Sequence, residues 1–178
     1  AIDECAAMVL ADFGHVDVLV NNAGRSIRRA VVESYDRFHD FERTMQLNYF
    51  GAIRMIMNLL PSMTAQRSGH IVNISSIGVL TNAARFSAYV ASKAALDAYG
   101  RCLSAEVKHK NIEVTAIYMP LVRTPMIAPT KVYDYAPAWS PEHAADTVLK
   151  AILSRPKSVA TALGTAAQLS YALWPRLN

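Results

Sequence analysis

Hydrophobic positions along this chain follow two different periods that alternate with each other. Short runs rich in valine and isoleucine are typical of buried strands, whereas apolar residues that recur every three to four positions are typical of amphipathic helices. Because strands alternate with helices, the pattern predicts an α/β fold with a doubly wound parallel sheet of the Rossmann type, in one unit over residues 1–178. Strands are predicted at 16–20, 70–75, 112–119 and 158–162, and helices at 2–13, 38–65, 86–110 and 140–154.

Turn and cap residues set the boundaries of these elements. Ser140 and Pro141 form a strong helix start, because serine caps a helix and proline suits its first turn. The segment 38–65 is predicted as one long helix or two abutting helices, and Pro61 is expected to kink it or end its last turn. The stretches 25–37, 77–85 and 120–137 are expected to be irregular. Residues 165–178 form an apolar tail, and the chain is expected to stop in the middle of a helix.

The composition is that of a globular protein, since 52% of the 178 residues are hydrophobic and 18% are charged. The apolar runs fall short of the roughly 18 residues that a membrane span requires, and the acidic start of the chain does not resemble a signal peptide. Cys5 and Cys102 lie far apart, and the five histidines lack the spacing of metal ligands. These features predict a cytoplasmic protein with no disulfide and no metal site.

The formal net charge is +4, and part of it is concentrated at Arg25, Arg28 and Arg29. Such a cluster is usually a solvated face. Its place directly after an Asn-Ala-Gly turn also suits an anionic ligand. Aromatic residues do not alternate with a basic stripe, so the sequence does not favour nucleic acid as a partner.

The most informative residues are Tyr89 and Lys93, which lie one turn apart on the same face of a predicted helix. A free tyrosine has a pKa of about 10, and a nearby ammonium group favours the phenolate. The pair therefore suits general acid–base chemistry on a carbonyl or an alcohol. The alternative is a core tyrosine beside a surface lysine.

Two further polar residues are candidates for the same site. Ser76 follows the strand 70–75 and is expected to point into the crevice at the carboxyl end of the sheet, where ligands bind in open α/β folds. Ser75 is a second choice, and a helix or turn cap is the alternative role for Ser76. Asn48 lies within a helix, where asparagine is unfavourable, so we expect a polar contact at a helix bulge. An incidental buried amide is the alternative there.

Two loops leave the predicted sheet at the same edge. Asn22, Ala23 and Gly24 follow the first strand, where small side chains let a flat ring approach and glycine permits a positive φ. Residues 120–124 leave the third strand and offer backbone groups and Thr124 to a carboxamide. A plain loop turn is the alternative in both places.

In order and spacing, these residues together resemble the short-chain dehydrogenase/reductase family. The resemblance implies that Tyr89 is the catalytic acid–base, that Lys93 lowers its pKa and binds the nicotinamide ribose, and that Ser76 positions the substrate carbonyl. Asn48 would support a water-linked proton relay. The implied cofactor is NADP or NAD, with NADP slightly favoured, and its contacts would be Asn22, Ala23, Gly24, Tyr89, Lys93, Pro120, Val122 and Thr124.

Two departures from the family pattern stand out. The chain has Pro120-Leu121 where the family usually has Pro-Gly, which is expected to narrow the loop beside the cofactor. The seven glycines are too dispersed to form the family's Gly-rich phosphate loop. We therefore expect an incomplete fold, without its first strands and that loop.

Longer segments are similar to the reductase domain of bacterial fatty acyl-CoA reductases and to related membrane-associated dehydrogenases. They are residues 26–29, 35–40, 45–51 and 118–126. This resemblance implies a lipid-like substrate, a long-chain aldehyde or an acyl thioester, and allows a peripheral contact with a membrane. The apolar residues of the loop 121–139 and of the tail are expected either to cover such a chain or to fill a core.

Two functions from different classes remain open. One is an NAD(P)-dependent oxidoreductase that is present here as a fragment, and the other is a non-catalytic α/β interaction module that cannot hold the dinucleotide. The helices 38–65 and 86–110 carry more apolar surface than one face of a sheet would cover. We therefore expect a homodimer or a larger homo-oligomer.

Overall fold

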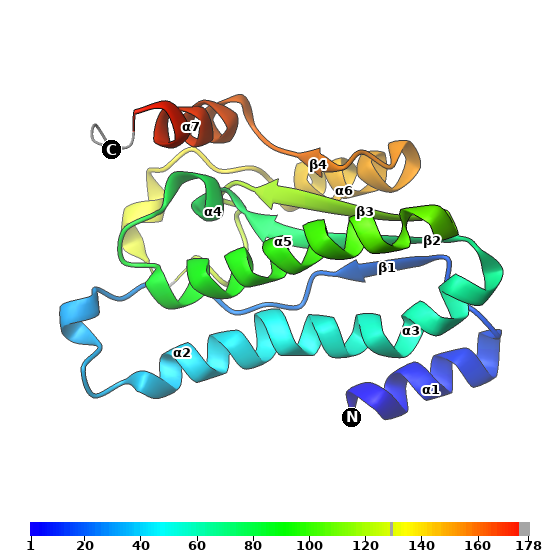
Figure 1. The fold of residues 1–178 in the computed structure, drawn as a ribbon. Coiled ribbons are helices and arrows are strands. Elements are labelled where there is room, and N and C mark those ends of the chain that lie inside the picture. Colours follow the sequence, from blue (N-terminus) through cyan, green and yellow to red (C-terminus); the bar gives the residue numbers. More distant parts are fainter. Residues whose placement is uncertain (129, 175–178) are drawn as a thin grey trace.

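A parallel sheet with helices on both faces forms the centre of the computed structural model, which describes residues 1–128 and 130–174 (Figure 1). Neighbouring strands pair in parallel in the order of the sequence, and this confirms the predicted α/β class. The strands are β1 (Val18–Asn21), β2 (Gly69–Ser76), β3 (Ile112–Met119) and β4 (Ser158–Val159).

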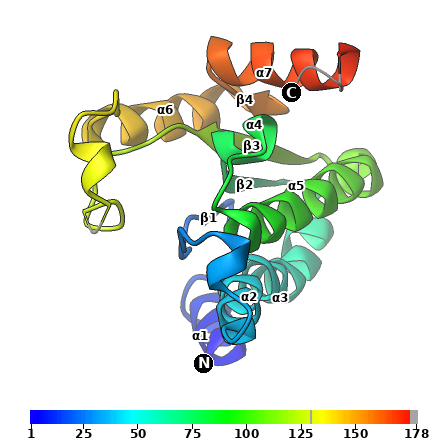
Figure 2. The ribbon, with the colours of Figure 1, turned by 90° about the vertical axis from the view of Figure 1, so that its left-hand side faces the viewer.

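The two faces of the sheet are covered by different helices (Figure 2). Alternate residues of a strand point to opposite faces, so Ile71 packs in the cluster that contains Ile56 and Leu103, whereas Val72 packs with Ala151. The first face carries α2 (Phe38–Met45), α3 (Ala52–Gln66) and α5 (Ser87–Val107), with α1 (Ile2–Phe13) against α3, and the second face carries α6 (Pro141–Ser154).

The predicted helix 38–65 is one continuous helical rod with a π-helical segment, Gln46–Gly51, between α2 and α3. Pro61 does not end it, because α3 continues to Gln66. Proline removes the hydrogen bond to the carbonyl four residues earlier. Here that carbonyl belongs to Met57, which lies on the exposed side of the helix, where water can replace the lost donor.

Residues 77–81, predicted as a loop, form the short helix α4 (Ile77–Thr81). The tail forms α7 (Ala162–Leu173), which begins after a last strand shorter than predicted and agrees with the expected helix near the end of the chain. The tail helix packs on α4, where a Cβ on Gly164 would lie 3.1 Å from Leu80 Cδ1. The loop prediction at 77–81 was wrong because α4 is short and depends on this contact. Residue 129 of the predicted loop and residues 175–178 of the predicted tail lie outside the described residues.

The register of the sheet brings the carboxyl ends of its strands to one edge. Asn21 at the end of β1 pairs with Asn73, and Ser76 at the end of β2 pairs with Met119 at the end of β3. The segments that follow these strands therefore start beside one another. This edge is where the candidate site lies.

Candidate active site

A cleft of about 960 Å³ opens at the carboxyl edge of the sheet. It is lined from β1, β2, α5 and the segment after β3, so tertiary structure unites residues that are far apart in the sequence. Eight of the ten predicted site positions line it, and Ala23 and Asn48 do not. The eight are Asn22, Gly24, Ser76, Tyr89, Lys93, Pro120, Val122 and Thr124.

Tyr89 and Ser76 meet in this cleft. Burial raises the pKa of Tyr89, because a phenolate loses its hydration there, and a hydrogen bond with Ser76 offsets part of that rise. Ser76 Oγ also accepts a hydrogen bond from the Gly78 N–H at 3.1 Å and so caps α4. A hydroxyl that accepts through its oxygen keeps its own proton for another acceptor. Ser76 therefore combines the cap role and the site role that the sequence left as alternatives.

Lys93 is buried, with 3% of its surface exposed, and its Nζ donates a 2.8 Å hydrogen bond to the Ile74 carbonyl. Burial lowers the pKa of Lys93 to about 8. Burial shifts both pKa values, because desolvation disfavours the phenolate of Tyr89 and the ammonium of Lys93 alike. That Lys93 lowers the pKa of Tyr89 stays a prediction.

Asn48 lies directly beneath the cleft, in the π-helical segment, which confirms the expected helix bulge. Its Oδ1 accepts from the Arg25 N–H at 2.7 Å, and its Nδ2 donates to the Arg25 carbonyl at 2.9 Å. The same Nδ2 donates to Ser92 Oγ at 2.9 Å. Asn48 thus fixes the loop after β1 against α5. These hydrogen bonds give it a structural role, in contrast to the alternative of an incidental buried amide.

Gly24 stands where this loop comes closest to Asn48 and Lys93. A Cβ on Gly24 would lie 3.3 Å from Asn48 Oδ1 and 3.3 Å from Lys93 Nζ. Among the described glycines a positive φ is found at Gly14 and not at Gly24, so the predicted dihedral reason for this glycine is wrong. Both distances are tighter than an ordinary Cβ contact, so glycine lets the loop pack closely against Asn48 and Lys93.

The segment after β3 is held beside the cleft by its own backbone. Trp139 N–H donates to the Leu121 carbonyl at 2.8 Å, and Arg123 N–H donates to the Trp139 carbonyl at 3.0 Å. Thr124 Oγ1 has a long contact of 3.5 Å with the Val122 carbonyl. This weak contact leaves the Thr124 hydroxyl free for a stronger partner in the cleft.

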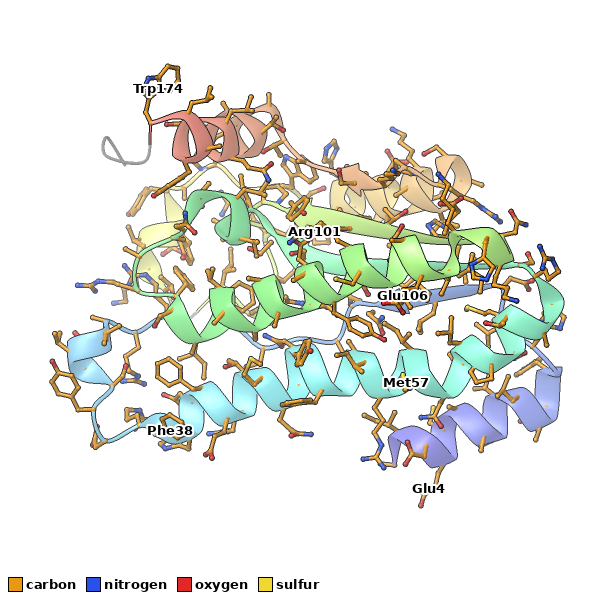
Figure 3. The ribbon with its side chains drawn as sticks, in the orientation of Figure 1. Glu4, Phe38, Met57, Arg101, Glu106 and Trp174 are labelled. Carbon is orange, nitrogen blue, oxygen red and sulfur yellow. The ribbon has the colours of Figure 1, made fainter. Side chains whose placement is uncertain are left out.

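Much of the cleft wall is apolar. In the predicted covering loop, Tyr133 lines the cleft but Tyr135 is 94% exposed. The described part of the tail does not line it: α7 packs on α4, and Trp174 points away from the body of the molecule (Figure 3). The expectation that the apolar side chains of residues 163–174 cover a bound chain is therefore wrong. The apolar wall includes Met126, Ile127, Tyr133, Val148, Leu149 and Ile152.

Three further polar residues lie at or beside the cleft, and of these Ser92 was not a predicted candidate. Ser92 receives the Asn48 hydrogen bond and donates to the Tyr89 carbonyl at 2.7 Å. The sequence feature that could have identified Ser92 is the one that identified Asn48: a small polar residue inside a helix. Ser75, named only as a second choice, lines the cleft with a buried Oγ that has no hydrogen-bond partner among the described residues. Arg28 also lines the cleft, and it belongs to the basic cluster whose place in the sequence suited an anionic ligand.

In the part of the chain that the structure describes, no group of three or more histidine, cysteine, aspartate or glutamate side chains could hold a metal ion. None of the helices described is long and apolar enough to cross a membrane.

Comparison with known proteins agrees with this geometry. The sequence model of the family described as short chain dehydrogenase matches residues 1–132. The chain is 66% identical over all of its length to a fatty acyl-CoA reductase of Acinetobacter baylyi and 45% identical over 99% of its length to the fatty acyl-CoA reductase Rv0547c of Mycobacterium tuberculosis. It spans 60% of the length of each of these relatives.

Solved structures share the fold. A short-chain dehydrogenase from Streptomyces avermitilis has a TM-score of 0.84 and 31% identity over 99% of this chain and 72% of its own. A short chain dehydrogenase from Burkholderia cenocepacia, in complex with NADP, also has a TM-score of 0.84, with 98% of this chain and 72% of its own covered. Its identity of 23% supports likeness of the fold alone.

Proposed function

The chain belongs to the short-chain dehydrogenase family, and we propose that it functions as an NAD(P)-dependent oxidoreductase that acts on a long-chain, lipid-like carbonyl compound. One observation carries the proposal: Ser76, Tyr89 and Lys93 line a single cleft whose far wall is apolar. A non-catalytic interaction module would not need these three side chains to share one cleft.

The residues of the cleft fit the nicotinamide half of the cofactor. Gly24 lines the cleft without a side chain, so a flat ring or a ribose can approach its backbone. Lys93 and Thr124 also line the cleft and offer polar groups to the nicotinamide and its ribose, and Asn22 offers an amide to the adenosine side. We propose NADP over NAD, and the NADP complex of the Burkholderia cenocepacia protein supports the choice of a dinucleotide of this class.

The proposed chemistry divides between cofactor and chain. When bound, the reduced cofactor supplies a hydride to the carbonyl carbon. Tyr89 gives its phenolic proton to the carbonyl oxygen, which Ser76 holds by a hydrogen bond, so an aldehyde becomes an alcohol. Burial raises the pKa of Tyr89, so the phenol is protonated at neutral pH and carries the proton that this step requires. Lys93 provides a buried donor beside it.

The apolar wall supports a long hydrocarbon substrate. It includes Met126 and Ile127 after β3 and Val148 and Leu149 of α6. Each methylene that leaves water for such a wall contributes roughly 0.8 kcal/mol. A long chain therefore gains affinity over a short one even after the cost of ordering it.

We further propose a cytoplasmic homodimer. Large apolar side chains are exposed along the outer side of the α2–α3 rod, where Figure 3 labels Phe38 and Met57. Covering such a stripe with a second copy removes it from water. Sedimentation of the complete protein at micromolar concentration tests this, and a strict monomer would contradict it. The exposed set is Phe38, Leu47, Phe50 and Met57.

The function itself is tested with the complete protein that carries these residues. We expect kcat/KM for NADPH-dependent reduction to rise along a series of aldehydes of increasing chain length, with NADH as a parallel cofactor. A flat profile, or a preference for small polar ketones, would discard the lipid-like substrate and leave only the general oxidoreductase assignment.

A further inference from the structure

Arg28 places a positive charge in the wall of the cleft. Among the described residues that line the cleft, the charged side chains are Arg28 and Lys93, and no aspartate or glutamate is present. A cleft of this kind combines an apolar wall with uncompensated positive charge. It is complementary to an amphiphile whose polar part is anionic.

Arg28 has no hydrogen bond or ion pair with any residue that the structure describes, and its side chain is exposed at the cleft. The neighbouring arginines differ. Arg29 Nε lies 3.3 Å from Asp40 Oδ2, and Arg37 Nε lies 3.1 Å from the same oxygen. The acidic partner in this region is therefore already shared by two other arginines, and the charge of Arg28 remains available to a ligand.

The loop that carries Arg28 is fixed at both ends. Asn48 binds both backbone groups of Arg25, and Arg29 N–H donates a 2.7 Å hydrogen bond to the Arg85 carbonyl. Arg85 precedes Phe86, whose ring centroid lies 6.2 Å from that of Tyr89. These contacts hold the backbone on both sides of Arg28 in place at the cleft. Lys93 lies beside Gly24, at the start of the same loop, where we place the nicotinamide ribose.

We propose that Arg28 determines substrate specificity by binding a phosphate group of the carrier in an acyl thioester. The inference rests on the proposed function and names its substrate class. The guanidinium group matches phosphate geometry with two parallel donors. Since Arg28 is exposed, the carrier lies at the mouth, the thioester carbonyl lies at Tyr89, and the acyl chain follows the apolar wall.

The test compares three substrates with one acyl chain: decanoyl-CoA, the decanoyl thioester of neutral N-acetylcysteamine, and decanal. Arg28→Gln should lower kcat/KM for decanoyl-CoA by roughly tenfold, mainly through KM, the loss expected of one charge-assisted hydrogen bond at a partly exposed site. The two neutral substrates should be unaffected. Arg28→Lys should retain part of the effect, since it keeps the charge without the planar fork.

Arg43→Gln is the matched control, because it removes one positive charge from an exposed position on α2 outside the cleft. It should leave all three substrates unchanged. Added salt should weaken the advantage of decanoyl-CoA in the wild-type protein but not in Arg28→Gln. A decanoyl carrier protein, which presents phosphate on a prosthetic arm, distinguishes a protein-borne carrier from free CoA.

The outcomes separate the two proposals. If the wild type reduces decanal but neither thioester, or if Arg28→Gln affects decanoyl-CoA and the neutral thioester equally, the role of Arg28 is wrong while the oxidoreductase assignment stands. If the wild type reduces none of the substrates with NADPH or NADH, the proposed function and this inference are both wrong.

Discussion

Asn48 Nδ2 lies 2.9 Å from Ser92 Oγ, and this hydrogen bond connects the π-helical segment to the turn of α5 between Tyr89 and Lys93. Ser92 extends this hydrogen-bond chain to Tyr89, because its hydroxyl donates to the Tyr89 carbonyl at 2.7 Å. On its other side Asn48 binds the backbone of Arg25. One buried amide therefore sets the position of the loop after β1 relative to the helix that carries the proposed acid.

Removing this amide should destabilise the protein. Asn48→Ala deletes three hydrogen bonds and leaves both backbone groups of Arg25 without their partner. We expect the free energy of unfolding to fall by about 2–4 kcal/mol, measured by chemical denaturation. Asn58→Ala is the control, since Asn58 makes its hydrogen bonds on the outer side of α3, and it should cost less than about 1 kcal/mol. Equal losses would show that Asn48 has no special structural role.

Tyr89→Phe should remove the proton donor and keep the packing of the ring. We expect kcat at saturating substrate to fall by about 10²-fold or more, the scale of losing a general acid. Tyr99→Phe changes another partly buried tyrosine of α5, one that packs in the core, and should retain wild-type turnover. Turnover near the wild-type level in Tyr89→Phe would exclude the catalytic role.

Lys93 should make stability depend on pH. Its pKa is about 8 in the folded protein against 10.5 for an ordinary lysine, so between these values the unfolded chain binds more protons than the folded one. Stability then rises with pH. Relative to Lys93→Met, the wild type should gain up to about 3 kcal/mol of unfolding free energy between about pH 7 and pH 10.5.

Denaturation at several pH values measures this gain. Lys108→Met is the control, because Lys108 is exposed at the end of α5 and should show no such gain. A difference between wild type and Lys93→Met that stays constant over this range would show that burial does not shift the pKa of Lys93.

The apolar wall can be tested with two leucines of α6. Leu149 and Leu153 are both largely exposed, but only Leu149 lines the cleft. Leu149→Gln should lower kcat/KM for a long-chain aldehyde by roughly 3- to 10-fold and leave a short one unchanged, because it places an amide where hydrocarbon packs. Leu153→Gln should affect neither. The same loss for both variants would mean that α6 acts through stability and not through the substrate.

Several features of this protein follow from local sequence. The valine- and isoleucine-rich runs determine β1, β2 and β3, because buried parallel strands require continuous apolar side chains. Since parallel strands end at one edge, strand order alone brings Ser76 to the same crevice as Asn22 and Pro120. Helical spacing then brings Tyr89 and Lys93 to that crevice.

Other features depend on contacts between distant segments. The helix α4 was not predicted because it is short and packs on α7, which lies about eighty residues later in the chain. The rise that burial causes in the pKa of Tyr89 was not predicted because desolvation depends on every element around the phenol. For the same reason, only the fold shows that Gly24 lets its loop pack closely and that Arg28 lacks a partner among the described residues. Sequence specifies short-range periodicity, whereas burial and charge pairing are properties of the packed chain.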